Sequence, residues 1–401
     1  MAVKVMNSKY QFIILGCENP LKKNILDTFF HHTDELGISR TSIQVIDSNN
    51  FYDYYTGSSP SCCLYFGDEN YNCESDHESE ILRQLNEDGT LIIPIVNNLT
   101  NFSNLVPKML EKVNGFELKT SENIERLVGC ILESFNLLRV SRRLFISYKR
   151  DESSSAAIQL FERLEKAGFD VFLDTHSIRP GEPFQEELWH RLADSDIVVL
   201  LNTPSFLKSE WTIQEIENAN KMSIGILQLI WPNSQLERGT ELNLQFKLSN
   251  KDFENEKFEN SKCTFIDSTI SKIIESVESL RARSLASRQD TLVTEFLNFS
   301  KKTDTETTLQ YHKWIKSVSK TGKHAVIIPT IGVPQAFTYY KCKDKHKDLL
   351  NEIECKDAQV FLLYDHINIK ENWMKHLEWL DTHLPVKTLR IIDAEGWLHK
   401  W

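Results

Sequence analysis

The sequence predicts an α/β protein built from parallel sheets covered by helices, with two to three domains. Short apolar runs of strand length alternate with segments whose apolar residues recur at helical spacing, and this alternation is typical of β-α-β units. The length of 401 residues supports more than one domain, at roughly 150 residues each. No apolar run approaches the roughly 18 residues that a membrane helix needs, so we expect no membrane association.

The composition is that of a folded protein. Hydrophobic residues make up 41% and charged residues 26%, which separates the chain from disordered sequences. The net charge of −11 offers no positive surface to a phosphate backbone, so we predict no direct nucleic-acid partner. The N-terminus lacks a secretory cleavage site, and the 8 cysteines contain no C-x-x-C pair. We therefore expect a reduced, cytoplasmic protein.

The first stretch, residues 1–140, is predicted to be an α/β domain. Its buried strands are expected at Gln11–Gly16, Ser42–Asp47, Cys62–Phe66 and Leu91–Val96. Asn19 and Pro20 suit the start of the first helix. Later helices are expected at Val106–Val113 and Glu122–Leu138.

The second stretch repeats this order with stronger signals. Leu144–Tyr148 reads as a strand, and Ser153–Ala167 reads as an amphipathic helix that ends at Gly168. Further strands are expected at Asp170–Leu173, Ile197–Leu201 and Ile224–Ile230, with helices at Phe184–Ala193 and Trp211–Ala219. The similar order of the first two stretches fits either a duplication or two unrelated domains.

The chain then passes through a polar segment, Asn233–Lys262, to a short strand expected at Thr264–Asp267. Helices are expected over Thr269–Arg281 and along Arg281–Thr303, the second as a bridge between domains.

The third stretch is again α/β in pattern. Strands are expected at His324–Pro329, Val360–Tyr364 and Thr388–Ile392, and the aromatic tail Gly396–Trp401 is expected to pack back onto them. One group of side chains there fits either ordinary core and surface positions or a sensor pocket: Asp365, His366, Trp373 and His376. We predict three domains, at residues 1–140, 141–282 and 283–401.

Several nucleotide and hydrolase motifs are missing. Gly322 and Lys323 lack the rest of a phosphate-binding loop, and no G-x-G-x-x-G or G-x-S-x-G pattern occurs. His31 and His32 are adjacent on a predicted helix and point about 100° apart, so they make a poor metal pair. We predict no metal site.

Polar residues follow the first two strands of the second stretch. Ser147, Tyr148, Lys149 and Arg150 come at the carboxyl end of one strand and Asp174 at the end of the next. Ligands of parallel sheets bind beyond these strand ends. Such a crevice would combine hydroxyls, two cations and a carboxylate.

Two further residues join this set. Trp211 and Glu215 are four apart on a predicted helix, so they share a face. With the strand-end residues they suit a ligand that carries an aromatic ring, a ribose and a pyrophosphate. Cleavage of an N-glycosidic bond builds positive charge on the ribose, and a fixed carboxylate stabilises that charge.

Four sequence blocks, in this order, resemble the Toll/interleukin-1 receptor (TIR) domain family, especially its bacterial members. They are F-I-S-Y at Phe145–Tyr148, F-L-D with an R-P-G loop at Phe172–Gly181, the apolar run at Ile197–Leu201, and W-x-x-x-E at Trp211–Glu215. The resemblance spans residues 142–280. It implies a central flavodoxin-like parallel sheet with helices on both faces, flanked by an α/β domain at each end.

The resemblance also implies an activity. Enzymatic TIR domains cleave NAD+ between nicotinamide and ribose, giving ADP-ribose or a cyclised ADP-ribose, with NAD+ as substrate and no other cofactor. The family's catalytic glutamate falls on Glu215, with Trp211 beside it. Lys149 and Arg150 fall on the family's basic positions, and Asp174 and Phe184 fall on positions that line the nucleotide cleft.

Self-association is a further implication. Thr175–Pro183 matches the loop that mediates TIR–TIR packing and gates the site, so a homo-oligomer is expected. The expected biological role is a bacterial antiphage immune effector, with a nucleotide second messenger or a phage component as its unidentified trigger. The alternatives are a non-enzymatic scaffold that recruits partners through this loop, and a cyclase whose product activates a separate effector.

Each site residue also has a simpler interpretation. Lys149 and Arg150 fit surface ion pairs, and Ser147 and Asp174 fit backbone caps. Glu186 and Glu187, after the loop, fit structural or interfacial positions, while Glu210 and Glu217 fit solvent-facing neighbours of Glu215.

The first stretch lacks the motifs of the second. At the place comparable to W-x-x-x-E it has Ser75–Ile81, with His77 in place of the tryptophan and Glu80 one residue too close. If this stretch is a degenerate TIR-like domain, we predict that it is inactive and regulatory.

Overall fold

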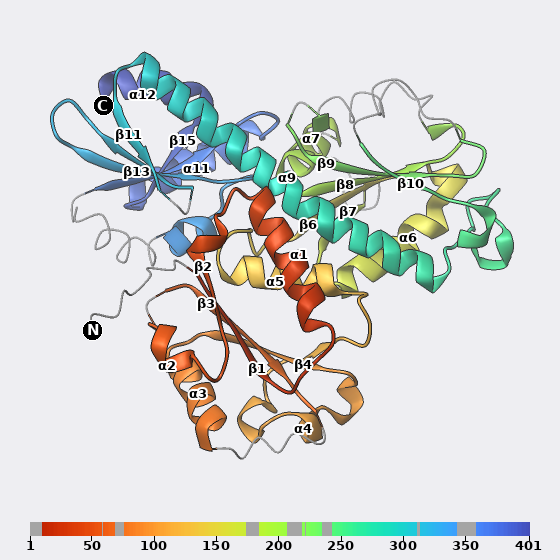
Figure 1. Cartoon of the computed structure of the whole chain (residues 1–401). Coiled ribbons are helices and arrows are strands. Elements are labelled where there is room, and N and C mark those ends of the chain that lie inside the picture. Colours follow the sequence, from red (N-terminus) through yellow and green to blue (C-terminus); the bar gives the residue numbers. More distant parts are fainter. Residues whose placement is uncertain are drawn as a thin grey trace. The chain divides into compact units, whose positions relative to one another are not determined.

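The computed structural model describes residues 10–57, 59–68, 76–173, 184–206, 219–220, 222–234, 243–310, 313–342 and 358–401. The chain divides into two compact units, Met1–Val140 and Ser141–Trp401. Each unit is described by itself (Figure 1).

The first unit is built on a five-stranded parallel sheet with strand order β2-β1-β3-β4-β5. Its strands are β1 (Tyr10–Gly16), β2 (Ile43–Ile46), β3 (Ser61–Phe66), β4 (Leu91–Val96) and β5 (Phe116–Glu117). Its helices are α1 (Lys22–Glu35), α2 (Phe51–Tyr54), α3 (Asp76–Glu87), α4 (Phe102–Leu105) and α5 (Ile124–Ser134). On one face, Phe29 of α1 lies against Phe12 of β1 and against Phe135, with ring centroids 4.9 and 5.9 Å away.

One helix expected in this unit is wrong. Over Val106–Val113 the chain forms only a single 3-10 turn at Lys108–Leu110, and the short helix α4 ends before this range. Pro107 separates the two, since the residue before a proline is pushed out of the helical conformation, and Val106 is extended at φ −129° and ψ 155°.

The first sheet of the second unit has strand order β10-β9-β8-β6-β7, and its strands are all parallel. They are β6 (Arg143–Ser147), β7 (Asp170–Leu173), β8 (Ile197–Asn202), β9 (Gly225–Ile230) and β10 (Leu244–Lys247). Counted from its own first strand, the order is 2-1-3-4-5, as in flavodoxin-like folds.

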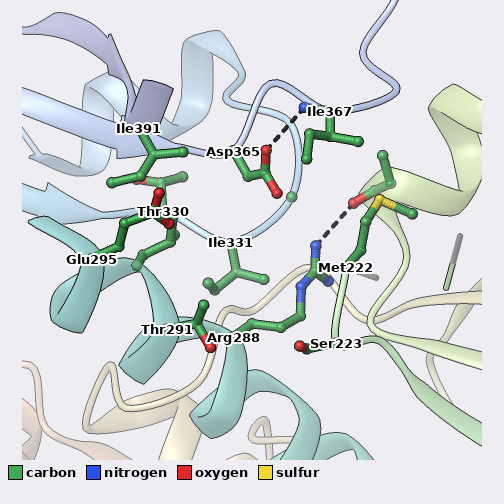
Figure 2. Close-up of a pocket in the computed structure, with 13 residues that line it drawn as sticks. Met222, Ser223, Arg288, Thr291, Glu295, Thr330, Ile331, Asp365, Ile367 and Ile391 are labelled. Atoms are coloured by element: carbon green, nitrogen blue, oxygen red, sulfur yellow. Dashed lines mark hydrogen bonds between the residues drawn. The ribbon is translucent and has the colours of Figure 1, made fainter. Parts of the chain in front are cut away.

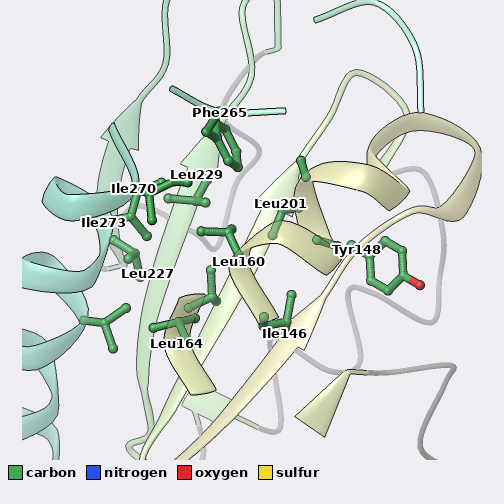
Figure 3. Close-up of a cluster of buried hydrophobic side chains, with 14 of the residues drawn as sticks. Ile146, Tyr148, Leu160, Leu164, Leu201, Leu227, Leu229, Phe265, Ile270 and Ile273 are labelled. Atoms are coloured by element: carbon green, nitrogen blue, oxygen red, sulfur yellow. The ribbon is translucent and has the colours of Figure 1, made fainter. Parts of the chain in front are cut away.

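Helices cover both faces of this sheet. One face packs against α6 (Arg150–Lys166) and the start of α9 (Asp267–Lys302), where Leu160 and Ile273 meet Leu227 (Figure 3). The other face packs against α7 (Phe184–Asp194) through Leu188 and Leu192. Both cores consist of aliphatic and aromatic side chains withdrawn from water, and this burial is the main stabilising contribution.

The polar segment after β9 differs from the expectation. It contains β10, a half-exposed edge strand whose L-Q-F-K sequence gave too weak an apolar signal. The strand expected at Thr264–Asp267 is absent, because Phe265 forms only an isolated antiparallel bridge with Phe253. Phe253, Phe265 and Trp231 instead form an aromatic cluster.

Helix α9 is one continuous helix of 36 residues. Its first half is anchored to the sheet of β6–β10 by buried polar contacts, including an ion pair of 2.7 Å between Arg281 Nε and Asp196 Oδ2. Its second half packs through Leu292 and Phe296 against Ile327 of the third sheet. The boundary predicted at residues 282/283 lies inside this helix, and the three-domain division stays a prediction.

The third sheet has strand order β11-β12-β13-β14-β15. Its strands are β11 (Glu306–Leu309), β12 (Ile315–Val318), β13 (His324–Pro329), β14 (Gln359–Tyr364) and β15 (Lys387–Arg390). The first three pair antiparallel and the last three parallel. The helices that follow β14 and β15 are α11 (Glu371–His383) and α12 (Ala394–Lys400). The tail does pack back, since Trp397 lies 4.9 Å from the ring of Phe361.

Among the described helices, none combines the length and the apolar character needed to cross a membrane.

Candidate functional site

The carboxyl end of β6 places the first candidate residues. Ser147 is the last residue of β6 and is 2% exposed, and Tyr148 follows it at 6%. The Tyr148 ring belongs to the hydrophobic cluster of this sheet, with its hydroxyl directed away from the other labelled side chains (Figure 3). Both residues therefore form the inner wall of the strand end, while the residues after them reach the surface.

Lys149 and Arg150 begin the next helix. Lys149 is extended at φ −100° and ψ 118° and precedes α6, whose first residue is Arg150. The Nζ of Lys149 lies 2.9 Å from Oε1 of Glu152, while Arg150 is exposed. Lys149 is thus half-buried at the strand end, whereas Arg150 is exposed to solvent.

Glu152 is a residue that the sequence reasoning missed. Its Oε2 accepts a hydrogen bond of 3.2 Å from the N–H of Ser205, which follows β8. Burial opposes ionisation of this carboxyl, but hydrogen bonds from the Thr203–Ser205 segment and from Lys149 outweigh it and lower the pKa of Glu152 to about 2. Glu152 is therefore a permanent anion that ties the end of β6 to the segment after β8.

A kink in α6 gives this region a turn of its own. Ser153 has φ −146° and ψ 23°, outside the helical range. The backbone N–H of Ser153 donates to the Lys149 carbonyl at 2.9 Å, and its hydroxyl donates to the same oxygen at 3.2 Å. Residues 149–152 thus form a separate turn, held at the strand end ahead of the regular helix.

The remaining candidates are not described by the structure. Trp211 and Glu215 lie in residues 207–218, and Asp174 and the loop Thr175–Pro183 lie in residues 174–183, all outside the described residues. Phe184 opens α7, but its side chain is outside them too. Of the predicted site, the described structure brings together Ser147, Tyr148, Lys149 and Arg150 at one strand end.

Residues 144–259 match the sequence profile of a family described as the TIR domain. The middle of this chain is a TIR domain. The resemblance is thereby confirmed, as is the α/β fold class with a central TIR domain and additional domains at both ends.

Two curated relatives align with part of the TIR domain. A probable 2' cyclic ADP-D-ribose synthase of Brachypodium distachyon is 31% identical over 74 residues, which are 18% of this chain and 33% of that protein. A 2' cyclic ADP-D-ribose synthase of Bacteroides thetaiotaomicron is 26% identical over 72 residues, which are 18% of this chain and 25% of that protein. The alignments thus span only a third and a quarter of these relatives.

Two solved structures align over most of the chain at low similarity. A putative phosphosugar isomerase from Silicibacter pomeroyi has a TM-score of 0.19 at 10% identity, covering 71% of this chain and 89% of its own. The C-terminal domain of a glucosamine-fructose-6-phosphate aminotransferase from Francisella tularensis has a TM-score of 0.21 at 9% identity, covering 72% and 87%. At these scores neither informs the fold or the function.

Helix α7 of the TIR domain is bound to the C-terminal part of the second unit. Glu187 is 7% exposed and forms ion pairs with Arg191 and with Lys370. Burial opposes ionisation of Glu187, but the hydrogen bonds from these two cations lower its pKa. Glu186 is exposed. The carboxylate of Glu187 thus serves contacts within the second unit.

The polar group expected near the end of β14 is divided by the structure. The indole N–H of Trp373 donates to the Pro334 carbonyl at 3.1 Å, and its ring lies 5.4 Å from that of His376. Asp365 and His366 instead occupy the loop between β14 and α11. Over the ranges that the structure describes, no three His, Cys, Asp or Glu side chains gather to hold a metal ion.

Proposed function

We propose that the TIR domain cleaves NAD+ at the bond between nicotinamide and ribose, with Glu215 as the catalytic carboxylate. The observation that carries the proposal is the W-x-x-x-E sequence at Trp211–Glu215, inside the segment that matches the TIR family. The names of the two curated relatives, which are cyclic ADP-D-ribose synthases, support NAD-derived chemistry.

The proposed reaction requires one anionic side chain and no strong general acid. Nicotinamide leaves as a neutral molecule from a cationic ring, so no strong general acid is needed. The Glu215 carboxylate stabilises the positive charge that builds on the ribose as the bond breaks. Trp211 stacks on the nicotinamide or supports Glu215, while Asp174 and Phe184 line the nucleotide cleft. NAD+ is the substrate, and no further cofactor enters the reaction.

The strand-end cations suit the other end of the substrate. Lys149 and Arg150 offer charged donors to a pyrophosphate placed beyond β6, although Glu152 offsets the charge of Lys149. Glu152 is ionised at every pH above about 2, so it donates no proton to the leaving group. Its role in the proposed reaction is to position Lys149.

The identity of the second nucleophile decides the product. Attack by water on the ribose cation gives ADP-ribose, and attack by a group of the same nucleotide gives a cyclic ADP-ribose. The names of the two relatives support cyclisation as the second candidate reaction. We further propose that self-association through Thr175–Pro183 activates the protein in an antiphage response, with the flanking domains receiving the trigger.

The deciding experiment incubates the purified full chain with NAD+ and resolves the products by chromatography. Glu215→Gln is expected to abolish nicotinamide release, while Glu217→Gln, two residues away, retains it. Raising the protein concentration should raise the specific activity if self-association is required. Equal release by wild type and Glu215→Gln would contradict the assignment of Glu215. No release from any variant, even when assembly is forced by fusion to an oligomer, would favour the scaffold.

A further inference from the structure

A pocket of about 70 Å³ lies within the second unit, where α9 crosses the third sheet. The carboxyl ends of three parallel strands open onto it: Thr330 follows β13, Asp365 follows β14 and Ile391 follows β15. Helix α9 supplies Arg288 and Glu295 (Figure 2). In open α/β sheets, ligands bind outside the carboxyl ends of the strands, and this pocket occupies that position.

The pocket has an acidic side. Glu295 and Asp365 both line it, at its solvent-exposed side, and the carboxylate of Glu295 makes no hydrogen bond or ion pair with any other residue of the described ranges. Burial and the nearby charge of Asp365 raise the pKa of Glu295. One oxygen of Asp365 accepts the N–H of Ile367 at 3.0 Å, so the loop holds this side chain in place.

The cation in the same pocket is held by main-chain carbonyls. The Nη1 of Arg288 donates to the Ser195 carbonyl at 2.8 Å. Its Nη2 donates to the Ala193 carbonyl at 3.1 Å, which is the dashed line at Arg288 in Figure 2. The guanidinium is therefore directed at the end of α7. An anionic ligand would meet two carboxylates, whereas a ligand that carries hydrogen-bond donors would meet two acceptors.

We propose that this pocket, whose volume of about 70 Å³ holds only a few heavy atoms, binds the donor-bearing end of a small molecule, which presents hydroxyl or ammonium groups to Glu295 and Asp365. A sugar with two adjacent hydroxyl groups and an amine share this chemistry. The side chains of Ile331 and Ile391 offer an apolar surface for the remainder of the molecule.

The pocket is connected to the TIR domain through a short loop. Residues 365–370 carry Asp365 at one end and Lys370 at the other. The ammonium group of Lys370 pairs with Glu187 of α7, and its backbone N–H donates to His190 Nδ1 at 3.4 Å. A second connection joins the N–H of Val333, next to pocket residue Gly332, to Asp194 Oδ1 at 2.9 Å.

A ligand that repositions Asp365 therefore displaces the contacts of Lys370 with α7, and one that repositions Gly332 displaces the contact at the last residue of that helix. This helix begins directly after residues 174–183, which hold Asp174 and the loop of the proposed NAD+ site. Ligand binding in the pocket would thus affect the proposed NAD+ site through a displacement of α7. This part of the inference rests on the proposed function, whereas the binding itself does not.

The binding test uses the full chain and isothermal titration calorimetry. Adenosine is the diol probe, 2',3'-dideoxyadenosine is its matched control without the two hydroxyls, and spermidine is the ammonium probe. We expect one of the two donor probes to bind, and Asp365→Asn combined with Glu295→Gln to weaken it by about tenfold or more. Glu306→Gln, an exposed carboxylate on β11, should change the affinity by less than about twofold.

The outcomes separate the sources of the donors. Binding of adenosine but not of dideoxyadenosine, weakened in the double variant, assigns the pocket to a sugar diol. Binding of spermidine alone, weakened in the same variant, assigns it to an amine. If neither donor probe binds, or if the double variant binds as well as the wild type, the proposal is wrong. Thermal unfolding of each variant verifies that it is folded.

A second measurement tests the connection to α7 without any enzymatic activity. Bound probe is expected to change amide hydrogen exchange along Phe184–Asp194 in the wild type. In Lys370→Met, affinity should stay within about twofold while the change in exchange is lost. An unchanged α7 in the ligand-bound wild type would overturn the coupling. Because this readout needs no NAD+ cleavage, its failure is distinguishable from failure of the proposed function.

Discussion

Two sheets of this chain share a topology and differ where chemistry is expected. The sheet of the first unit and the sheet of the TIR domain both place their strands in the order 2-1-3-4-5, all parallel. At the carboxyl end of its first strand, the first unit has Gly16, with φ +84°, where a Cβ would overlap the backbone of Phe66 on β3. The TIR domain has Ser147 there, followed by Lys149 and Arg150.

The difference shows that the fold alone does not make a site. In the first unit the strand end is closed by main chain, since the N–H of Cys17 donates to the Phe66 carbonyl at 2.9 Å. In the TIR domain the corresponding position carries side chains, braced by Glu152 against the segment after β8. This supports, without testing it, the prediction that the first unit is inactive.

The largest expected effect contrasts the acidic residues at comparable places in the two sheets. Glu215→Gln should lower the rate of NAD+ cleavage by about a thousandfold, because the ribose cation loses the carboxylate that is proposed to stabilise it. Glu80→Gln on α3 of the first unit, an exposed residue, should leave the rate within about twofold. Nicotinamide release measures both. A large loss in Glu80→Gln would mean that the first unit takes part in the reaction.

Next in size is the contrast between two glycines. Gly16→Ala should lower the free energy of unfolding by about 3 kcal/mol or more, because the new methyl group meets fixed backbone and φ is positive. Gly168→Ala in the TIR domain also has a positive φ, of +90°, but the nearest atom to a new Cβ is 3.9 Å away. Its expected cost is about 1 kcal/mol, from the backbone conformation alone. Urea unfolding of the two variants measures both losses in the free energy of unfolding. Equal losses would refute the argument that the new methyl group at residue 16 overlaps the backbone of Phe66.

A smaller effect concerns the brace in the TIR domain. Glu152→Gln should cost about 1 kcal/mol at pH 7, a modest value because the carboxylate is partly exposed to water. The pKa of Glu152 falls from 4.5 to about 2 on folding, so its contribution is complete above pH 4.5 and is lost as the pH falls toward 2. Urea titrations at pH 7 and pH 3 should show the gap between wild type and variant narrowing at pH 3. If wild type and variant differ by the same free energy of unfolding at both pH values, the charge of Glu152 does not account for the difference.

The smallest effect compares two buried histidines whose pKa values move in opposite directions. Burial opposes protonation of His32, but Glu125 at 2.6 Å outweighs it and, with Glu35, raises the pKa. Burial lowers the pKa of His190, although Asp194 and Glu187 oppose this and Lys370 and Arg191 add to it. His32 therefore stabilises the fold below pH 6.5 and loses that contribution as the pH rises through its raised pKa.

The linkage for His190 has the opposite sign. Its lowered pKa means that stability is lost as the pH falls from 6.5 through the folded value. The free energies of unfolding of His32→Gln and His190→Gln should be measured from pH 5 to 8 and subtracted from that of the wild type. Plotted against pH, the two differences should have opposite slopes. Curves of the same slope would contradict one of the two assignments.

The sequence predicted well the strands that contain several consecutive apolar residues, and predicted poorly those that mix polar and apolar residues. β7 and β13 have the predicted bounds, because V-F-L and A-V-I-I form short apolar runs within them. β10, β11 and β12 were missed, because their sequences L-Q-F-K, E-T-T-L and I-K-S-V resemble polar linkers. Helix α9 was predicted as two pieces, since Arg281 and Arg288 read as surface residues although both are buried.

The same reasoning explains what was found of the site. Ser147 and Lys149 could be placed because the carboxyl ends of parallel strands follow from the strand pattern alone. Glu152 could not, because its role depends on Ser205, 53 residues later in the chain. The placement of Trp211 and Glu215 lies outside the described residues, so their assignment still depends on the family motif.

Helix α9 has a consequence for how this TIR domain could be exchanged between proteins. Ser284, beyond residue 282, accepts the N–H of Gly225 at 2.8 Å and donates to the Asp196 carbonyl at 3.1 Å. A TIR domain excised at residue 282 would lose these contacts, together with the two carbonyls that Arg288 holds at the end of α7. A transplantable TIR domain must therefore carry about six turns of α9, to Arg288. Recombination at the apparent boundary would leave the amino-terminal ends of β8 and β9 without these contacts.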